Sequence, residues 1–337
     1  MRTASTARRA TLRDVATEAG VSQMTVSRAL GGRSRIADDT RRRILSIADR
    51  LGYRPDPEVA KLMVHLRGRR TRRFQSVLMG LTTRAPDDRE QYFRTLIAGA
   101  RLQASSRGYG FDLMHLSPEP GGWAGVQRML ESRGVEGILL LPQQSPVDLT
   151  TLLAWPQFSV VAASASPTGP SVHRVMPHHF ANTLLLCRTL AAQGHRRIGL
   201  VIPAEHDVRS EHGFTAAVTW HGLNELQSHV PPLVAHEASP SALRAWFARE
   251  RPDVIVTHEL SSARDCARLI GRRLAGPPRF VVTSLTGANP GRIAGIDERP
   301  AAIGAAAADL LASMVERRVR GQAASPASTL LTGIWSA

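Results

Sequence analysis

The apolar positions of residues 11–30 repeat with the spacing of two short helices joined by a tight turn. Thr11 can cap the first helix, with Asp14 three residues later, and Gly20 can take the positive φ that such a turn requires. Ser22 can cap the second helix. The apolar face of this helix pair would consist of Val15, Ala16, Ala19, Val26, Ala29 and Leu30.

A third helix is predicted to begin at Asp38 or Asp39, and its apolar stripe would close a small core with the first two helices. The stripe consists of Ile44, Ile47, Ala48 and Leu51. The second helix keeps a polar first turn outside this core, which is the arrangement that lets a helix enter the major groove of DNA. The pattern of residues 10–54 therefore predicts a helix-turn-helix domain, with an ordinary helical hairpin as the alternative.

From Ser76 onward, apolar strand-like runs alternate with helical stretches in two successive series. Such alternation predicts parallel sheets covered by helices on both faces, here two Rossmann-like α/β lobes. The first series has strands at about 77–81, 111–114, 138–141 and 158–162, with helices at about 91–107 and 123–133. The second series has strands at about 198–202, 233–235, 254–256 and 280–282, with helices at about 179–193, 212–224, 241–249 and 261–273. A last helix is expected at about 301–318.

The 337-residue chain carries a formal net charge of +15, and most of this excess lies near the amino terminus. Residues 1–73 hold 18 Lys and Arg against 7 Asp and Glu, which gives +11, whereas residues 74–337 hold 25 against 21, which gives +4. A polyanion would therefore meet the amino-terminal segment. No apolar run approaches the ~20 residues of a membrane span, and no apolar signal segment is found. Cys187 and Cys266 are too few for a disulfide framework, which suits the cytoplasm.

The amino-terminal pattern resembles the lactose/galactose repressor (LacI/GalR) family of bacterial transcription regulators. The residues that carry the resemblance are Thr11-Leu12-Arg13-Asp14-Val15-Ala16, Ala19-Gly20-Val21-Ser22, Thr25-Val26-Ser27-Arg28, Thr40-Arg41 and Gly52-Tyr53-Arg54-Pro55. After residue 75 the resemblance is weaker. It rests there on Gly99, Gly134 to Ile138, Gly194 to Gly199, Gly213-Phe214 and Ile303-Gly304.

The resemblance implies a helix-turn-helix domain at 10–54, a hinge helix and linker at 55–73, and an effector-binding and dimerisation domain at 74–337. The last domain would resemble periplasmic sugar-binding proteins, with a small-molecule effector in the cleft between its lobes. Because chains of this family cross repeatedly between the lobes, the last helix is expected to return to the first lobe. The first lobe would comprise about 74–173 and 298–325, and the second about 174–297 and 326–335.

The resemblance also implies a homodimer that binds a palindromic operator in double-stranded DNA, with repression as the default. At the opening of the second helix, Gln23 can bind adenine, Met24 can contact a thymine methyl, and Arg28 can reach a guanine edge. Arg54 is a further DNA-contacting candidate. Hydroxyls and backbone amides suited to phosphates belong to Thr11, Leu12, Ser22, Thr25 and Ser27. For the two hydroxyls within the second helix, solvated surface is the alternative.

The segment 55–67 resembles the hinge helix of the family, which folds when two copies meet over the minor groove. Leu62 matches the Leu that wedges between central base pairs, and Val59 matches a position that is often Ala. The alternative is a linker whose Leu62 packs on the core. Ala37 stands where relatives often have a capping Ser, so one phosphate contact is expected to be missing.

The effector pattern of sugar-binding relatives is incomplete in this chain. Ser210 stands where those relatives have an Arg three residues before Gly213, and no Asp pair follows Val282. Sugar hydroxyls need convergent planar donors and acceptors, so either a different ligand class fits or no small ligand does. The remaining effector-binding candidates, each with a solvated loop position as its alternative, are Arg209, Glu211, His258, Glu259, Asp265 and Asn289.

An enzyme and a solute-binding transport protein are the competing functions. The sequence contains no Gly-x-Ser-x-Gly elbow, no phosphate loop, no His-Glu-x-x-His motif and no cysteine constellation. The predicted helix-turn-helix domain argues against a solute-binding transport protein. His173, His178 and His179 cluster near the predicted lobe crossover, and satisfied or exposed histidines are favoured there over a metal site. The sequence therefore predicts a cytoplasmic DNA-binding regulator without enzymatic activity, cofactor or metal.

Overall fold

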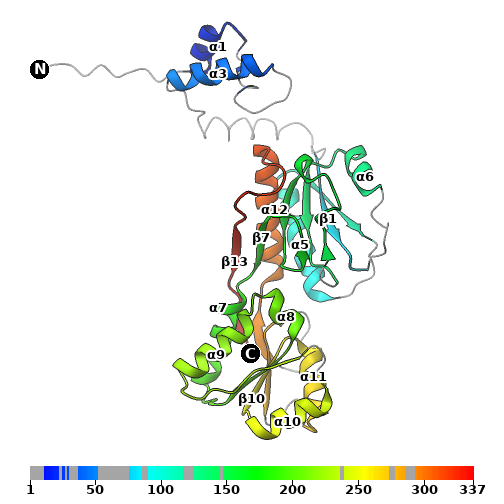
Figure 1. The fold of residues 1–337 in the computed structure, drawn as a ribbon, viewed down its shortest axis with the longest axis vertical. Helices are drawn as coiled ribbons and strands as arrows, with labels where there is room; N and C mark the ends of the chain where they lie inside the picture. Colours follow the sequence, from blue (N-terminus) through cyan, green and yellow to red (C-terminus); the bar gives the residue numbers. More distant parts are fainter. Residues whose placement is uncertain are drawn as a thin grey trace, which may run out of the picture. The chain divides into compact units, whose positions relative to one another are not determined.

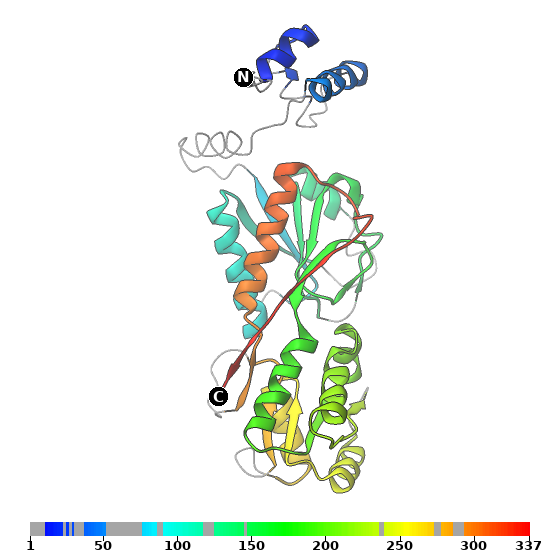
Figure 2. The ribbon, with the colours of Figure 1, turned by 90° about the vertical axis from the view of Figure 1, so that its left-hand side faces the viewer.

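The structure is a computed structural model that describes residues 11–22, 25–26, 29, 37–51, 76–85, 90–116, 125–144, 147–235, 239–272, 278–285 and 293–337. It divides into two compact units, Met1–Arg73 and Phe74–Ala337, each with its own apolar core. Figure 1 shows their folds, and Figure 2 shows them after a quarter turn. Within the described ranges, no helix is long and apolar enough to cross a membrane.

The amino-terminal unit packs α1 (Leu12–Ala19) against α3 (Asp38–Arg50). Two short stretches between them, at 25–26 and at 29, are also helical. The small core consists of Val15, Ala16, Ala19, Val26, Ala29, Ile44, Ile47 and Ala48, with Val21 and Leu51 partly buried against it. These are the apolar positions that the helical spacing predicts, except that Leu30 lies outside the described residues.

The ends of α1 are fixed by local hydrogen bonds. The Oγ1 atom of Thr11 accepts a bond from the Asp14 backbone N–H at 3.3 Å, and the Asp14 carboxylate accepts one from the Thr11 backbone N–H at 2.8 Å. Gly20 ends the helix with a φ of 62°, in the left-handed region that glycine adopts most easily. The Arg43 guanidinium of α3 donates to the Ala19 carbonyl at 3.1 Å, which ties the carboxyl end of α1 to the third helix. Ala37 begins α3 without a side-chain cap, as the sequence implies.

The first lobe of the larger unit is a parallel sheet with the strand order β13-β7-β5-β3-β1-β2. Helices α5 (Gln91–Ser106) and α12 (Pro300–Arg317) cover one face, and α6 (Val126–Ser132) covers the other (Figure 1). Because both faces are buried at the centre of the sheet, β1, β3 and β5 are almost continuously apolar, whereas the edge strand β13 is largely exposed. The strands are β1 (Val77–Thr82), β2 (Gly110–His115), β3 (Gly137–Leu140), β5 (Ser159–Ala162), β7 (His173–Pro177) and β13 (Ser328–Leu331). The lobe also contains β4 (Val147–Asp148), β6 (Pro167–Thr168) and the 3-10 turn η1 (Trp155–Gln157).

The second lobe repeats this plan with the strand order β14-β12-β11-β10-β8-β9, in which only β14 runs antiparallel to its neighbour among the described pairings. Helices α7 (His179–Ala192) and α9 (Gly213–Asn224) cover one face, and α10 (Pro240–Glu250) and α11 (Leu260–Leu269) cover the other. The short helix α8 (Ala204–Arg209) follows β8. The strands are β8 (Ile198–Pro203), β9 (Leu233–Ala235), β10 (Val254–Thr257), β11 (Arg279–Val282), β12 (Ala294–Asp297) and β14 (Ile334–Ser336). The predicted fold class is confirmed.

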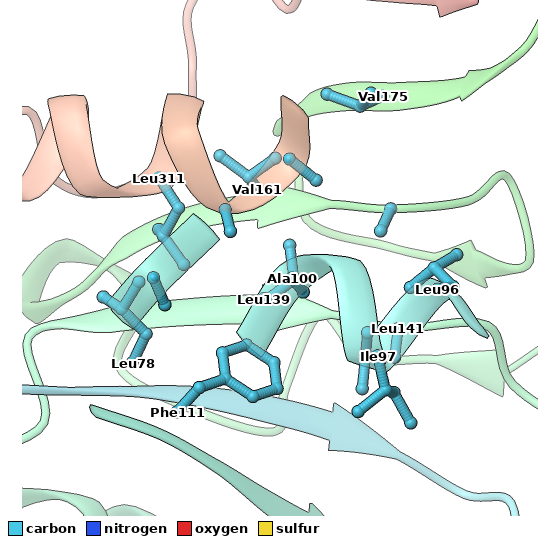
Figure 3. Close-up of a cluster of buried hydrophobic side chains, with 14 of the residues drawn as sticks. Leu78, Leu96, Ile97, Ala100, Phe111, Leu139, Leu141, Val161, Val175 and Leu311 are labelled. Atoms are coloured by element: carbon cyan, nitrogen blue, oxygen red, sulfur yellow. The ribbon is translucent and has the colours of Figure 1, made fainter. Parts of the chain in front are cut away.

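Helices α5 and α12 cross in close contact in the first lobe because both carry a glycine at the crossing. A Cβ at Gly99 would collide with the Ala301 carbonyl, and a Cβ at Gly304 would collide with the Leu96 carbonyl. Figure 3 shows the apolar side chains that gather between these helices and the sheet, including Leu78, Leu96, Leu139, Val161 and Leu311. The last helix thus packs on the first lobe, where the sequence analysis expected it.

The chain passes between the lobes after β7, after β12, and between β13 and β14 (Figure 2). The first and last of these crossings are hydrogen-bonded to each other. The backbone N–H of His178 donates to the Leu331 carbonyl at 2.8 Å, and that of Gly333 donates to Asn182 Oδ1 at 2.7 Å. The first turn of α7 therefore holds the last crossing in place.

The lobe boundaries differ from those expected at two points. Residues 174–177 continue β7, and residues 328–331 form β13, so both belong to the first sheet and not to the second lobe. The two strands pair in parallel, with Ser328 opposite Arg174. The boundary was misplaced because this pairing joins segments far apart in the chain, and no local pattern encodes it.

Candidate functional site

The amino-terminal unit presents capped helix starts next to exposed hydroxyl groups. Thr11 and Ser22 are exposed, and Thr25 is half-buried. The Ser22 Oγ accepts a hydrogen bond from the Thr25 backbone N–H at 3.1 Å and lies 2.9 Å from the Thr25 hydroxyl, so Ser22 caps the second helix. Leu12 is the first residue of α1. Free backbone N–H groups at such helix starts suit phosphate oxygens.

The predicted base-reading and hinge residues have no described position, nor have the phosphate candidate Ser27 and the DNA-contacting candidate Arg54. They are Gln23, Met24, Ser27, Arg28, Arg54, Val59 and Leu62, all of which lie outside the described residues. Their roles stay predictions. What the described part of this unit provides is the scaffold, because Val26 and Ala29 fix the inner face of the second helix against α1 and α3.

The second candidate site lies where the carboxyl ends of the strands of both lobes meet. In open α/β sheets, ligands bind at these ends. Arg84 follows β1, His258 follows β10, and Glu298 follows β12. Charges of the two lobes act on each other here: Glu90 and Arg84 of the first lobe both affect the pKa of Arg209 on α8. We call this set of residues the inter-lobe site.

Three histidines and one phenylalanine form a ring cluster on the second-lobe side. The rings of His206 and His258 are 4.3 Å apart between centroids, Phe214 meets His258 edge-on at 5.9 Å, and His179 lies 4.8 Å from Phe214. The Nδ1 of His258 lies 3.2 Å from the Thr283 hydroxyl. No group of three or more potential metal ligands exists among the described residues, so the cluster is not arranged as a metal site.

Two imidazoles of this cluster, those of His206 and His258, have pKa values lowered in favour of their neutral form. Burial lowers the pKa of His258 well below its ordinary value of 6.5, and the nearby His206, His179 and Arg209 lower it further. Burial also lowers the pKa of His206, with Arg209 adding to the effect and Glu205 opposing it. Neutral imidazole offers one donor and one acceptor, so these rings can form hydrogen bonds with an uncharged or anionic ligand.

Several polar atoms at the inter-lobe site are buried without a hydrogen-bond partner in the described structure. They include the Nδ1 atoms of His179 and His206 and the Oε1 of Glu298. His179 Nδ1 and Glu298 Oε1 lie 3.3 Å apart, but their geometry is not that of a hydrogen bond. Burial raises the pKa of Tyr92 well above its usual value, and the charges of Glu298 and Glu90 raise it further. Unpaired buried polar atoms are rare in native proteins and mark places where another molecule can bind.

The arginines of the inter-lobe site differ in their partners. Arg84 forms an ion pair with Glu90 and lies over the Phe93 ring, 5.3 Å from its centroid. Arg174 donates to the Ser164 carbonyl at 3.0 Å; burial lowers its pKa, and Glu211 across the lobes opposes this shift. Arg209 has no hydrogen bond or ion pair with any described residue, although burial lowers its pKa.

The structure brings only some of the predicted effector residues together. Arg209 and His258 lie at the inter-lobe site, and Glu211 acts on Arg174 from a left-handed backbone position with a φ of 54°. Glu259 is exposed, accepts a hydrogen bond from Ser261, and raises the pKa of His206. Asp265 binds Arg268 at 2.8 Å on the exposed side of α11, and no described contact joins it to the other candidates. Asn289 lies outside the described residues.

Sequence reasoning missed several residues of this site. Ser210, which replaces an expected Arg, is buried and donates to the Asp207 carbonyl at 2.8 Å. A signal was present for some of the missed residues: Thr283 directly follows the predicted strand at 280–282, and Tyr92, His179 and Phe214 lie at the starts of predicted helices. The missed residues are Arg84, Glu90, Tyr92, Arg174, His179, His206, Phe214, Thr283 and Glu298.

Comparison with known proteins accounts for both units. Residues 11–56 match the lacI family of bacterial regulatory proteins, and residues 81–325 match the periplasmic binding proteins and sugar binding domain of the LacI family. The chain belongs to the LacI family. Similar proteins include the HTH-type transcriptional repressor PurR of Mannheimia succiniciproducens, 27% identical over 191 residues, which are 56% of this chain and 54% of that protein.

A PurR repressor of Haemophilus influenzae strain PittEE is 28% identical over 195 residues, which are 57% of this chain and 54% of that protein. The chain thus spans about half the length of the curated relatives it matches. Among solved structures, the CelR–cellobiose complex aligns with a TM-score of 0.56 at 19% identity, over 98% of this chain and 99% of that chain. The Lac repressor dimer bound to operator and the anti-inducer ONPF aligns with a TM-score of 0.53 at 19% identity, over 98% of each chain. These structures share the fold with this LacI-family chain.

Proposed function

We propose that this LacI-family chain is a sequence-specific DNA-binding transcription regulator, a repressor that binds a palindromic operator as a homodimer. The observation that carries the proposal is the helix-turn-helix unit, in which a capped α1, the Gly20 turn and the exposed Thr11 and Ser22 hydroxyls lie in the most basic part of the chain. The repressor names of the PurR relatives support it. The structure of a Lac repressor dimer on its operator supports the assembly.

Base edges would be read by Gln23, Met24 and Arg28, and phosphate contacts would fix the register of the protein on the duplex. Leu62 would wedge between central base pairs in the minor groove, with Val59 beside it. The residues proposed for phosphate contacts are Thr11, Leu12, Ser22, Thr25, Ser27 and Arg54.

A small molecule at the inter-lobe site would modulate DNA affinity. Arg209, Glu211 and His258 are the proposed effector residues that the structure supports, because they lie among groups contributed by both lobes. Asp265, which no described contact joins to these groups, and Asn289, which lies outside the described residues, are proposed from the sequence alone. Binding would change the angle between the lobes at the hydrogen-bonded crossings, and so alter how the two copies present their DNA-binding units. A coupling of about 1–3 kcal/mol shifts operator occupancy tenfold or more.

The relatives of this chain are transcriptional repressors, and we infer that it likewise acts by binding and without catalysis. Its place of action would be the cytoplasm, where bacterial operators are found. This inference rests on the proposed DNA binding, since a protein that reads an operator must share a compartment with the chromosome.

Selection of random double-stranded sites by the purified full-length chain at low ionic strength tests the proposal. We expect enrichment of an imperfect palindrome, and binding that weakens steeply with salt because phosphate contacts release counterions. Arg28→Ala should relax the preference at one position of each half-site, with a cost of about 1–3 kcal/mol. The matched variant Arg128→Ala, on the exposed side of α6, should bind as the parent does. Failure to enrich any duplex would overturn the proposal.

The proposed wedge has a separate test. Leu62→Ala should weaken binding to the selected palindrome, because the apolar insertion that kinks the central step is lost. Gel-shift titration measures the change. Equal affinity of parent and variant would assign Leu62 to a packing role and leave the helix-turn-helix proposal intact.

A further inference from the structure

Arg209 contacts no carboxylate directly among the described residues, although the charges of Glu205 and Glu90 act on it. Its guanidinium ends α8 at the inter-lobe site, it is half-buried, and it forms no hydrogen bond or ion pair with any described residue. Arginine side chains that leave water normally bind a carboxylate or phosphate, often with two parallel hydrogen bonds. A partly buried guanidinium without such a partner is therefore poised for one from outside the chain.

The carboxylates near Arg209 are engaged elsewhere or exposed. Glu90 forms its ion pair with Arg84. Glu205, one turn earlier on α8, has a side chain that is 62% exposed, and its nearest basic contact is His206 at 4.0 Å. Burial is the largest influence on the pKa of Arg209 and lowers it; the charge of Glu205 raises the pKa, that of Arg84 lowers it, and that of Glu90 raises it. A directly bound anion would counteract the cost of burial.

The wall beside Arg209 is flat and uncharged. His206 is on the same short helix, and its ring lies 4.3 Å from that of His258 in a tilted arrangement; His258 in turn meets Phe214 edge-on. The Nδ1 of His206 is buried without a hydrogen-bond partner. A ligand that binds Arg209 through an anionic group would therefore have the neutral imidazole of His206 beside it.

We propose that the effector is a small organic anion, whose carboxylate or phosphate group binds Arg209 while its neutral part contacts the His206 ring. The inference rests on the proposed effector function and specifies the class of ligand. A neutral sugar would bury the guanidinium further without bringing a charged group into direct contact with it, which is unfavourable. The absence of the Arg expected at position 210 agrees with this, because the basic group is displaced by one residue and the usual sugar-binding set is not reproduced.

Ligands that share a carbon skeleton and differ in charge test the proposal. The full-length chain, without DNA, is titrated with glucose, gluconate, glucose 6-phosphate, acetate and inorganic phosphate at constant ionic strength, and binding is followed by calorimetry and by the thermal midpoint. We expect at least one anion to bind and to raise the midpoint, with glucose without effect. Preference for gluconate and acetate would identify a carboxylate ligand, and preference for the two phosphates a phosphate ester.

Variants assign the binding to the site. Arg209→Gln should weaken the binding of the anion by about tenfold or more, as expected for the loss of a charge-assisted hydrogen bond. Arg209→Lys should retain part of it, and the matched Arg128→Gln variant should retain all of it. Anion binding that persists in Arg209→Gln, or anions that bind no better than glucose, would overturn the proposal. Because these titrations contain no DNA, their failure is distinguishable from failure of the operator selection.

Discussion

The two lobes share one architecture but differ in how their polar groups are satisfied at the carboxyl ends of the strands. In the first lobe, Gln143 follows β3 and is buried with its side chain fully engaged. Its Oε1 accepts a hydrogen bond from the Thr83 backbone N–H at 2.7 Å, and its Nε2 donates to the Leu81 carbonyl at 3.2 Å and to the Leu141 carbonyl. At this end of the first lobe, the donors and the acceptor of the Gln143 side chain all have hydrogen-bond partners.

At the corresponding end of the second lobe, several buried polar atoms have no hydrogen-bond partner in the part of the chain that the structure describes. The Nδ1 atoms of His179 and His206 and the Oε1 of Glu298 are buried without hydrogen-bond partners in the described structure. Because a buried unpaired polar atom costs stability, groups kept in this state have a use beyond folding. The comparison indicates that the first lobe is the rigid support and that the second lobe supplies the groups that meet a ligand.

The largest effect is expected from the helix crossing of the first lobe. Gly304→Val would place side-chain atoms against the Leu96 carbonyl, so α5 and α12 would have to separate. We expect a loss of about 3 kcal/mol or more in the free energy of unfolding, or failure to fold. Ala98→Val, on the exposed side of α5, is the matched control and should cost far less. Thermal unfolding of both variants measures the difference, and equal losses would contradict the crossing as described.

A smaller loss in the free energy of unfolding is expected when the hydrogen bonds of Gln143 in the first lobe are removed. Gln143→Leu keeps the volume but leaves the Thr83 N–H buried without an acceptor. We expect a cost of about 2 kcal/mol in the free energy of unfolding, measured by denaturant titration. Anion binding at Arg209 should be retained if the first lobe acts as a support.

Acid should weaken the second lobe through its histidines. The pKa values of His206 and His258 are lowered by burial, so folding favours their neutral forms, whereas the unfolded chain titrates near 6.5. The stabilisation is complete above pH 6.5 and is lost as the pH falls through the lowered pKa values. His258→Gln should therefore reduce the drop in thermal midpoint between neutral and mildly acidic pH.

Val218→Ala is the control for this acid effect, because it removes buried apolar atoms from the same lobe without changing a titrating group. It should lower the midpoint equally at both pH values. Part of the drop should persist in His258→Gln, since burial also lowers the pKa of His221. If the pH dependence of the thermal midpoint is the same in His258→Gln as in the parent, His258 does not contribute to the loss of stability in acid.

The smallest effect is expected from Glu298→Gln. It replaces a buried carboxylate, whose Oε1 accepts no hydrogen bond in the described structure, by a neutral amide of the same shape, so the free energy of unfolding should change by less than about 0.5 kcal/mol or increase. Chemical denaturation compares it directly with Gln143→Leu. A loss as large as that of Gln143→Leu would show that both lobes use their polar ends for stability, and the contrast between them would not hold.

Local features of this fold are predictable from the sequence, and distant pairings are not. The Thr11 cap, the Gly20 turn and the strand at 77–81 depend on neighbouring residues, and the sequence predicts all of them. The pairing of β13 with β7 does not, and its expected lobe assignment was wrong. Arg209 could be picked out because it lies near the Gly213-Phe214 pair that marks the start of α9.

The ring cluster could not be predicted in the same way. His179, His206 and His258 come from three different segments, and their rings come together only when the second lobe has folded. The partners of Gln143 are likewise fixed by the β1–β3 pairing. A polar residue directly after a buried strand is the signal that a sequence can offer for such positions.

The order of the strands has a consequence for biosynthesis. Residues 328–336 supply β13 to one sheet and β14 to the other, and they leave the ribosome after every segment with which they pair. α12, which fills the first lobe, is likewise translated after the second lobe. A nascent chain therefore carries two incomplete sheets until residues 328–336 emerge from the ribosome. Premature termination within these residues would leave a strand edge open in both lobes at once, which favours aggregation.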